Sequence, residues 1–121
     1  MISARGDYDK LSGGKILLFN PGDVETDFCL YSNFNLLKIA IGADLILEFN
    51  PMTKKRLDFG IRINSKTNLI EGVDENKSPT GTLYNEYVKC GDFFKIPIGR
   101  SELIVDGVIS DTDIEYDYLY Y

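Results

Sequence analysis

The sequence predicts an all-β protein, an antiparallel β-sandwich made of two sheets. Roughly nine short runs of apolar or alternating residues recur at intervals of about ten residues, which is typical of sandwiches and barrels. Several runs alternate between apolar and polar residues, so each has one face for a core and one for water. Only residues 82–88 are compatible with a helical turn, with Thr82 as its N-cap, and they are too few for a helix of consequence.

Size and composition favour one domain with one core. The chain has 121 residues, of which 44% are hydrophobic and 26% are charged, and this is the globular range. Its 13 basic and 19 acidic residues give a net charge of −6, so we expect no nucleic acid partner. The apolar runs are far shorter than the ~20 residues of a membrane span. We therefore expect a soluble protein that is made in the cytoplasm and has no membrane partner.

Strand candidates follow one another from residue 15 onward. Residues 1–14 show no periodicity and are expected to form an N-terminal arm or linker, so the sandwich domain is expected to span residues 15–121. The clearest hairpin joins residues 36–41 and 45–49 through a short connection that contains Gly42. The other predicted strands are 15–19, 25–31, 57–63, 69–70, 93–98, 102–105 and 111–120, and residues 73–81 are expected to form a loop.

The last predicted strand alternates most strictly, with acidic residues at odd positions and mostly apolar residues at even ones. Its apolar side is expected to face the core and its acidic side to face solvent or a partner. The residues expected on the core side are Ile114, Tyr116, Tyr118 and Tyr120, and those expected on the other side are Asp113, Glu115 and Asp117. Carboxylates at i and i+2 lie ~6–7 Å apart along a strand, so the series is interpreted as a solvated face and not as a metal site.

Residue types that support catalysis are scarce. Histidine, the commonest general base and metal ligand, is absent. The loop segment 74–76 lacks the regular oxygen spacing of a calcium loop, and nothing in the sequence selects a pair of carboxylates for glycoside hydrolysis. Cys29 and Cys90 are expected to be buried free thiols. We predict no catalytic residue, no metal site and no cofactor.

Four residues are candidates for ligand or partner contacts. Asn50 lies in a Phe-Asn-Pro tripeptide, residues 49–51, that is similar to part of the His-Phe-Asn-Pro-Arg segment with which galectins hold a sugar. Glu48 stands in place of the histidine, the chain has no tryptophan to stack on a sugar ring, and a plain strand-ending turn is the alternative interpretation. The basic cluster of Lys54, Lys55 and Arg56 would suit an acidic partner, and a solvated loop is its alternative interpretation.

Three segments, in this order and spacing, resemble a known family. Residues 19–23, Phe-Asn-Pro-Gly-Asp, lead into a strand. Residues 63–67, Ile-Asn-Ser-Lys-Thr, are followed by Leu69-Ile70 and a polar loop. Residues 91–99, Gly-Asp-Phe-Phe-Lys-Ile-Pro-Ile-Gly, are followed by an apolar run and a tyrosine-rich terminus. From Leu18 to Tyr121 the chain resembles the C-terminal, galectin-like module of the distal tail proteins of tailed bacteriophages, particularly long-tailed phages of Gram-positive hosts.

The resemblance implies a β-sandwich of galectin or jelly-roll type that serves as an adaptor at the tail tip of a virion. Its partners would be receptor-binding or other baseplate proteins, it would be oligomeric in the assembled tail, and it would be assembled in the host cytoplasm. Members of the family usually carry a ring-forming domain before this module, whereas here only residues 1–14 precede it, which leaves ring formation open. The alternative function is a carbohydrate-binding module that recognises host cell-wall glycans with tyrosines in place of tryptophan.

Overall fold

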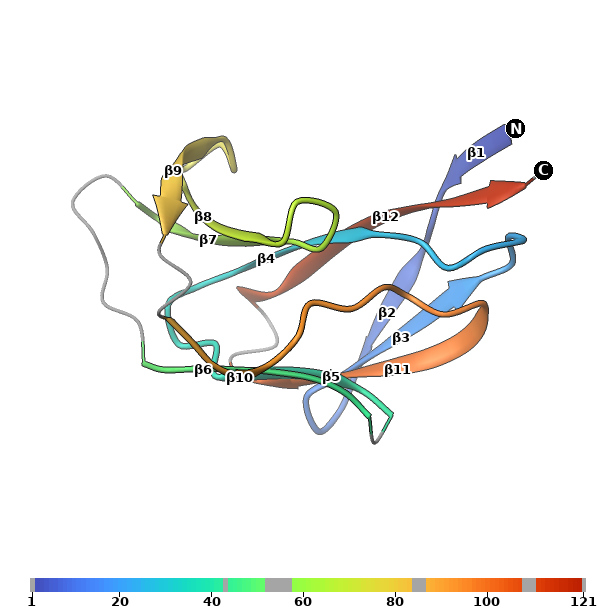
Figure 1. Ribbon diagram of the computed structural model, residues 1–121, viewed down its shortest axis with the longest axis horizontal. Coiled ribbons are helices and arrows are strands. Elements are labelled where there is room, and N and C mark those ends of the chain that lie inside the picture. Colours follow the sequence, from blue (N-terminus) through green and yellow to red (C-terminus); the bar gives the residue numbers. More distant parts are fainter. Residues whose placement is uncertain (1, 43, 52–57, 84–86, 108–110, 121) are drawn as a thin grey trace.

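The computed structural model confirms the predicted all-β fold with two antiparallel sheets. It describes residues 2–42, 44–51, 58–83, 87–107 and 111–120. Within these ranges twelve strands form two sheets of six strands each. Sheet A has the order β1-β12-β4-β7-β8-β9 and lies above sheet B, with the order β10-β6-β5-β11-β3-β2, in Figure 1. The strands are β1 (Ile2–Arg5), β2 (Tyr8–Leu11), β3 (Lys15–Asn20), β4 (Phe28–Ser32), β5 (Lys38–Ile41), β6 (Leu45–Phe49), β7 (Gly60–Asn64), β8 (Leu69–Val73), β9 (Pro79–Leu83), β10 (Val88–Gly91), β11 (Gly99–Asp106) and β12 (Asp113–Tyr120).

Branched aliphatic side chains fill the space between the two sheets. Ile16 and Leu18 of β3 and Leu103 of β11 are fully buried on the sheet B side, and Leu30 of β4 and Ile63 of β7 are fully buried on the sheet A side. Alternate residues of the same strands face outward, as the period of two in the sequence predicts. Each sheet therefore has one inner face that is mostly buried and one outer face that is available to a partner.

The prediction that the fold starts near Lys15 is wrong. β1 pairs with β12 at one edge of sheet A, and β2 pairs with β3 at one edge of sheet B. The chain passes from one sheet to the other at Gly6, whose N–H donates to the carbonyl of Tyr116 over 2.7 Å. A Cβ at Gly6 would lie 2.1 Å from the Tyr116 ring, so only glycine allows the backbone to approach this ring so closely. The segment expected to be an arm is thus part of both sheets.

Three other sequence expectations are corrected. Residues 73–81 are not all loop, because β9 begins at Pro79 and pairs with β8. The expected helical turn at 82–88 is shorter than predicted: β9 runs to Leu83 and β10 starts at Val88, Tyr87 between them is in a 3-10 turn, and 84–86 lie outside the described residues. Residues 93–98 form only one isolated bridge, between Ile96 and Thr26. In these places the backbone pairing that a segment finds, or lacks, decides its structure and not the local residue pattern.

The last strand has the predicted register, but only half of its apolar side is in the core. Ile114 and Tyr116 are buried at 2% and 3% exposure, whereas Tyr118 is half-buried and Tyr120 is 37% exposed. The reason is that the C-terminal half of β12 extends with β1 past the body of the sandwich, as Figure 1 shows at its upper right.

No helix in the described residues has the length and hydropathy that a bilayer span requires.

Candidate functional site: the outer faces of the two sheets

A row of four apolar residues and one lysine, Lys15, crosses the outer face of sheet B. Leu11 of β2 lies opposite Lys15 of β3, and Lys15 lies opposite Ile104 of β11. Ile104 lies opposite Ala40 of β5, which in turn lies opposite Ile46 of β6. Directly opposed residues of antiparallel strands share a face, so these five side chains form one line across five strands. We call the line from Leu11 to Ile46 the sheet B row.

Large side chains on this face are exposed. Phe19 is 49% exposed, Ile104 39% and Leu11 37%. The guanidinium carbon of Arg100 lies 5.6 Å from the centre of the Phe19 ring, within the range of a cation–π contact. Beside them lies a hollow of about 580 Å³ where β5 ends at Ile41 while β11 continues. The face thus offers an aromatic and aliphatic surface with a depression in it.

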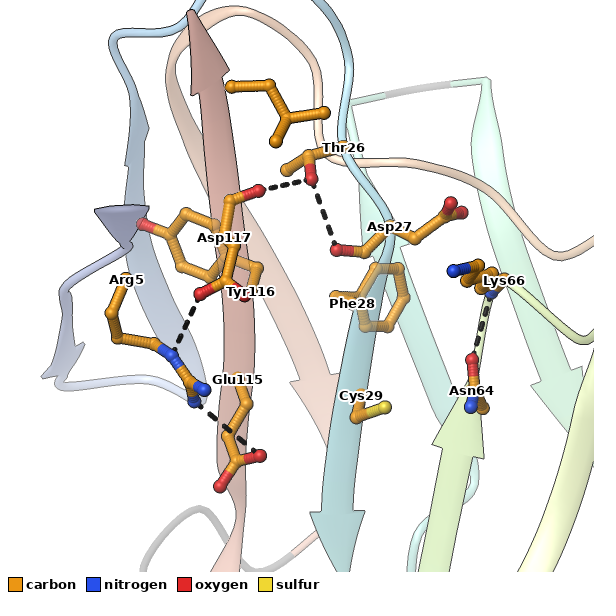
Figure 2. Close-up of a pocket in the computed structure, with 11 residues that line it drawn as sticks. Arg5, Thr26, Asp27, Phe28, Cys29, Asn64, Lys66, Glu115, Tyr116 and Asp117 are labelled. Carbon is orange, nitrogen blue, oxygen red and sulfur yellow. Dashed lines mark hydrogen bonds and ion pairs between the residues drawn. The ribbon is translucent and has the colours of Figure 1, made fainter. Parts of the chain in front are cut away.

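The outer face of sheet A is polar. Asp113 of β12 lies opposite Tyr31 of β4, which lies opposite Arg62 of β7, and Arg62 lies opposite Glu71 of β8. A second hollow, of about 360 Å³, lies on this face and is lined by charged side chains of β1 and β12 together with Asp27 and Lys66, which lie just outside the strands (Figure 2). The outer face of sheet B thus mixes exposed apolar and aromatic side chains with charged ones such as the Lys15–Glu102 pair, whereas the outer face of sheet A is mainly polar.

The acidic side of β12 is neutralised by cations from neighbouring elements. Arg5 of β1 contacts Asp117 at 2.9 Å and Glu115 at 3.6 Å, as Figure 2 shows. Lys10 and Lys77 lie 3.4 Å and 3.1 Å from the carboxylate of Asp113. The acids point to the outer face, as predicted, but the protein itself supplies their counter-charges.

Tyr8 and Asp113 form a pair that links the edge strand β2 to sheet A. The Tyr8 hydroxyl donates to Asp113 Oδ1 over 2.8 Å. Burial, followed by this hydrogen bond, raises the pKa of Tyr8 to about 12. Burial alone would raise the pKa of Asp113, but hydrogen bonds from Tyr8 and Lys77 and the charges of Lys77 and Lys10 lower it overall. The pair is most stable as a neutral phenol beside a carboxylate.

Arg62 and Glu71 form a half-buried ion pair in the middle of the polar face. Their closest atoms, Nη2 and Oε1, are 2.7 Å apart, and the two side chains are only 20% and 15% exposed. The hydrogen bond to Glu71 is the main cause that raises the pKa of Arg62. Arg62 Nε is buried and has no hydrogen-bond partner among the described residues. Beside the pair, Lys77 lies 5.4 Å from the centre of the Tyr31 ring.

The candidate contact residues from the sequence lie away from both hollows, as far as the structure describes them. Asn50 follows β6 and is exposed, and its N–H donates to the carbonyl of Tyr87 over 2.7 Å. It borders a separate shallow hollow of about 370 Å³ together with Lys38, Glu48 and Lys89. Lys54, Lys55 and Arg56 lie outside the described residues, so the basic cluster stays a prediction.

The two cysteines are free, as predicted, but the prediction that both are buried is wrong. Cys29 is half-buried on the polar face, where burial raises the pKa of its thiol, and Cys90 is exposed in the edge strand β10. Within the described ranges no group of three or more histidine, cysteine, aspartate or glutamate residues is arranged to hold a metal ion.

The sheet B row was not singled out from the sequence. Its members lie in five strands whose pairing is set by distant residues, and each of them is unremarkable within its own strand. The only local signal is that apolar residues occupy both odd and even positions of one strand, with Leu17 and Phe19 beside Ile16 and Leu18, which indicates a strand with two apolar faces.

Comparisons of the chain with protein-family models, with curated proteins and with solved structures find no match.

Proposed function

We propose that the chain is a non-enzymatic module that binds another protein through the outer face of sheet B. The observation that carries the proposal is the sheet B row, with Ile104 and Leu11 exposed in it and Phe19 exposed beside it. Exposed apolar side chains gathered on one face of a protein mark places where proteins associate. Aromatic side chains and arginine are enriched at the centre of such contacts, and Phe19 with Arg100 supplies one of each.

The finer part of the proposal is that the partner is another bacteriophage tail protein. It rests on the three segments that resemble the distal tail proteins, and the β-sandwich is the architecture that this resemblance implies. In this proposal the chain is a structural adaptor in the tail tip or baseplate of a virion, contacts neighbouring tail proteins or the receptor-binding protein, and is assembled in the host cytoplasm.

Mixing the chain with the proteins encoded beside it tests both parts. Sizing with light scattering is expected to show a stable complex with at least one tail protein. Ile104→Lys, which adds a second charge to the sheet B row opposite Lys15, is expected to weaken that complex at least tenfold because the added ammonium group would be desolvated without a partner. Ile2→Lys makes the same change at a more exposed isoleucine of sheet A, at 69%, and is the matched control.

Two results would count against the proposal. A complex that tolerates Ile104→Lys as well as it tolerates Ile2→Lys would exclude the sheet B row as the contact. A chain that binds none of the neighbouring tail proteins would remove the tail-tip assignment.

A carbohydrate-binding function is the second candidate, and the polar face of sheet A favours it. The Arg62–Glu71 pair is held rigid by burial, and the ring of Tyr31 lies beside it. Planar polar groups next to an aromatic ring suit the hydroxyls and the apolar face of a sugar. Titration with host cell-wall polysaccharide is expected to shift the NMR signals of these residues, and Tyr31→Ala is expected to abolish the shifts. Unchanged spectra at millimolar sugar would exclude this function.

A further inference from the structure

The four edge strands of the two sheets differ in how they are protected against pairing. Natural sheets protect their edges with proline, bulges or charges placed in the strand. β9 begins with Pro79, and its pairing with β8 contains a register shift. β10 also contains a register shift and ends at Gly91, whose φ is +91°. β2 carries Asp9 and Lys10 at its centre.

β1 has none of these protections in its described residues. Its sequence is Ile-Ser-Ala-Arg, its pairing with β12 is regular over all four residues, and its one charge is turned away from the edge. The Arg5 guanidinium lies on the outer face of sheet A, 2.9 Å from Asp117 and 3.6 Å from Glu115 (Figure 2). The edge therefore presents its backbone groups without a charge that would repel a further strand.

The backbone of Ser3 points out from this edge. Gly6 N–H donates to the carbonyl of Tyr116, so Gly6 turns its backbone groups toward β12. Backbone groups alternate in direction along an antiparallel strand, so Ala4 and Ile2 also turn toward β12, while Arg5 and Ser3 turn away from it. Ser3 thus offers an N–H and a C=O to a further strand.

An uncovered apolar surface lies along the same edge. Ile2 lies opposite Tyr120 and Ala4 opposite Tyr118, on the face of the sheet that looks toward the core. Because β1 and β12 extend past the sandwich here, Ile2 is 69% exposed and Tyr120 37%. The rings of Tyr118 and Tyr120 are in edge-to-face contact, with centres 5.5 Å apart, so this surface is already ordered.

We infer that this edge pairs with the same edge of a second copy of the chain, across a two-fold axis at Ser3. Antiparallel pairing centred there places Ser3 opposite Ser3 of the second copy, and the two serines exchange two N–H···O bonds. Ile2 then lies opposite Ala4 of the second copy. Both residues belong to the apolar side. One continuous apolar line therefore runs from Tyr120 and Ile2 of one copy to Ala4 and Tyr118 of the second copy.

The register makes this edge self-complementary. When a strand pairs antiparallel with a copy of itself, side chains on the same face of the sheet lie opposite each other only if the two-fold axis passes through a residue and not between two residues. With the axis at Ser3, Ile2 and Ala4 of both copies lie on one face. The two sheets A then continue into one another, and the one edge without protection is covered. This surface is separate from the sheet B row, so a dimer leaves that row free for the proposed protein partner.

Sedimentation velocity of the untagged full chain tests the dimer. A four-residue strand contact is at the small end of protein interfaces, so the experiment covers concentrations from roughly 10 µM to roughly 1 mM. We expect a shift from monomer to dimer within this range. Ser3→Pro removes the outward N–H and leaves the bonds to β12 intact, and Ile2→Lys charges the apolar line; each is expected to raise the dissociation constant at least tenfold. Ile104→Lys is the matched control and is expected to leave the dimer unchanged.

Amide hydrogen exchange gives a second readout. In the dimer the Ser3 amide is expected to exchange at least tenfold more slowly at the highest concentration than at the lowest. A chain that stays monomeric over the whole range overturns the inference. A dimer that Ile2→Lys weakens no more than Ile104→Lys does also overturns it, and this comparison holds even if Ser3→Pro does not fold.

Discussion

Removal of the Tyr116 hydroxyl is expected to destabilise the fold more than its size suggests. Tyr116 belongs to β12 of sheet A, is 3% exposed, and its hydroxyl reaches backbone outside its own sheet. The hydroxyl donates to the carbonyl of Asp7 at the turn between β1 and β2, and it lies 3.0 Å from the carbonyl of Phe19 in β3. It also accepts the Phe19 N–H over 3.2 Å. One side-chain atom thus connects sheet A, sheet B and the crossing chain.

The magnitude follows from these contacts. Tyr116→Phe keeps the ring, so no large cavity forms, but it removes a hydrogen bond worth about 1 kcal/mol and leaves the Phe19 N–H without its acceptor, which costs about 1–2 kcal/mol more. Taking the lower end of this sum, we expect the free energy of unfolding to fall by about 2 kcal/mol. An unfolding entropy of ~2.1 cal/mol/K per residue over 121 residues converts this into a melting temperature that is ~8 °C lower.

Thermal and urea unfolding of the variant and the wild type measure this difference. Tyr118→Phe is the matched control, because it deletes the same atom two residues away on a half-buried ring, and it is expected to cost less than ~0.5 kcal/mol. The reasoning is refuted if both variants unfold at the same temperature, since the Tyr116 hydroxyl would then not connect the sheets.

Three further predictions concern the same side of the sandwich. Gly6→Ala places a Cβ 2.1 Å from the Tyr116 ring and should destabilise the protein by about 1–3 kcal/mol in urea unfolding; wild-type stability would show that the corner tolerates a side chain. The raised pKa of Tyr8 favours its neutral form in the fold, so its contribution is complete below pH 10 and is lost as pH rises toward 12; Tyr8→Phe should lose less stability over that range. The lowered pKa of Asp113 acts in the opposite direction, so its contribution is present above its ordinary value of 3.8 and is lost on further acidification; acid titration of Asp113→Asn should show a smaller loss than wild type.

The alternation of apolar and polar residues within strands, together with the turn residues between them, was sufficient to predict the centre of the fold from the sequence. The hairpin of β5 and β6 is a local contact between two apolar runs joined by a glycine turn, and Gly42 has the positive φ that such a turn requires. The two faces of β12 could be predicted because the strand is eight residues long and alternates between acidic and mostly apolar residues. Predictions of this kind succeed where neighbouring residues decide the structure.

β1 and β2 could not be predicted in the same way. Each has four residues, and each is an edge strand that buries little, so neither shows an apolar period. Their stability comes from partners far along the chain, such as Tyr120 for Ile2 and Asp113 for Tyr8. The sheet B row has the same origin, because it exists only in the register of five strands. Local sequence carries no record of such pairings.

The pairing of Ile2 with Tyr120 also determines how the domain would respond to mechanical load. The two strands are antiparallel and their outer ends leave the fold side by side, as Figure 1 shows. A pull between these ends would load the backbone pairs of β1 and β12 one after another, beginning with Ile2 and Tyr120, in the manner of a zipper. A pull between one end and the outer face of sheet B would instead be shared by the whole core. The same domain would therefore open at low force or resist it, depending on where it is held.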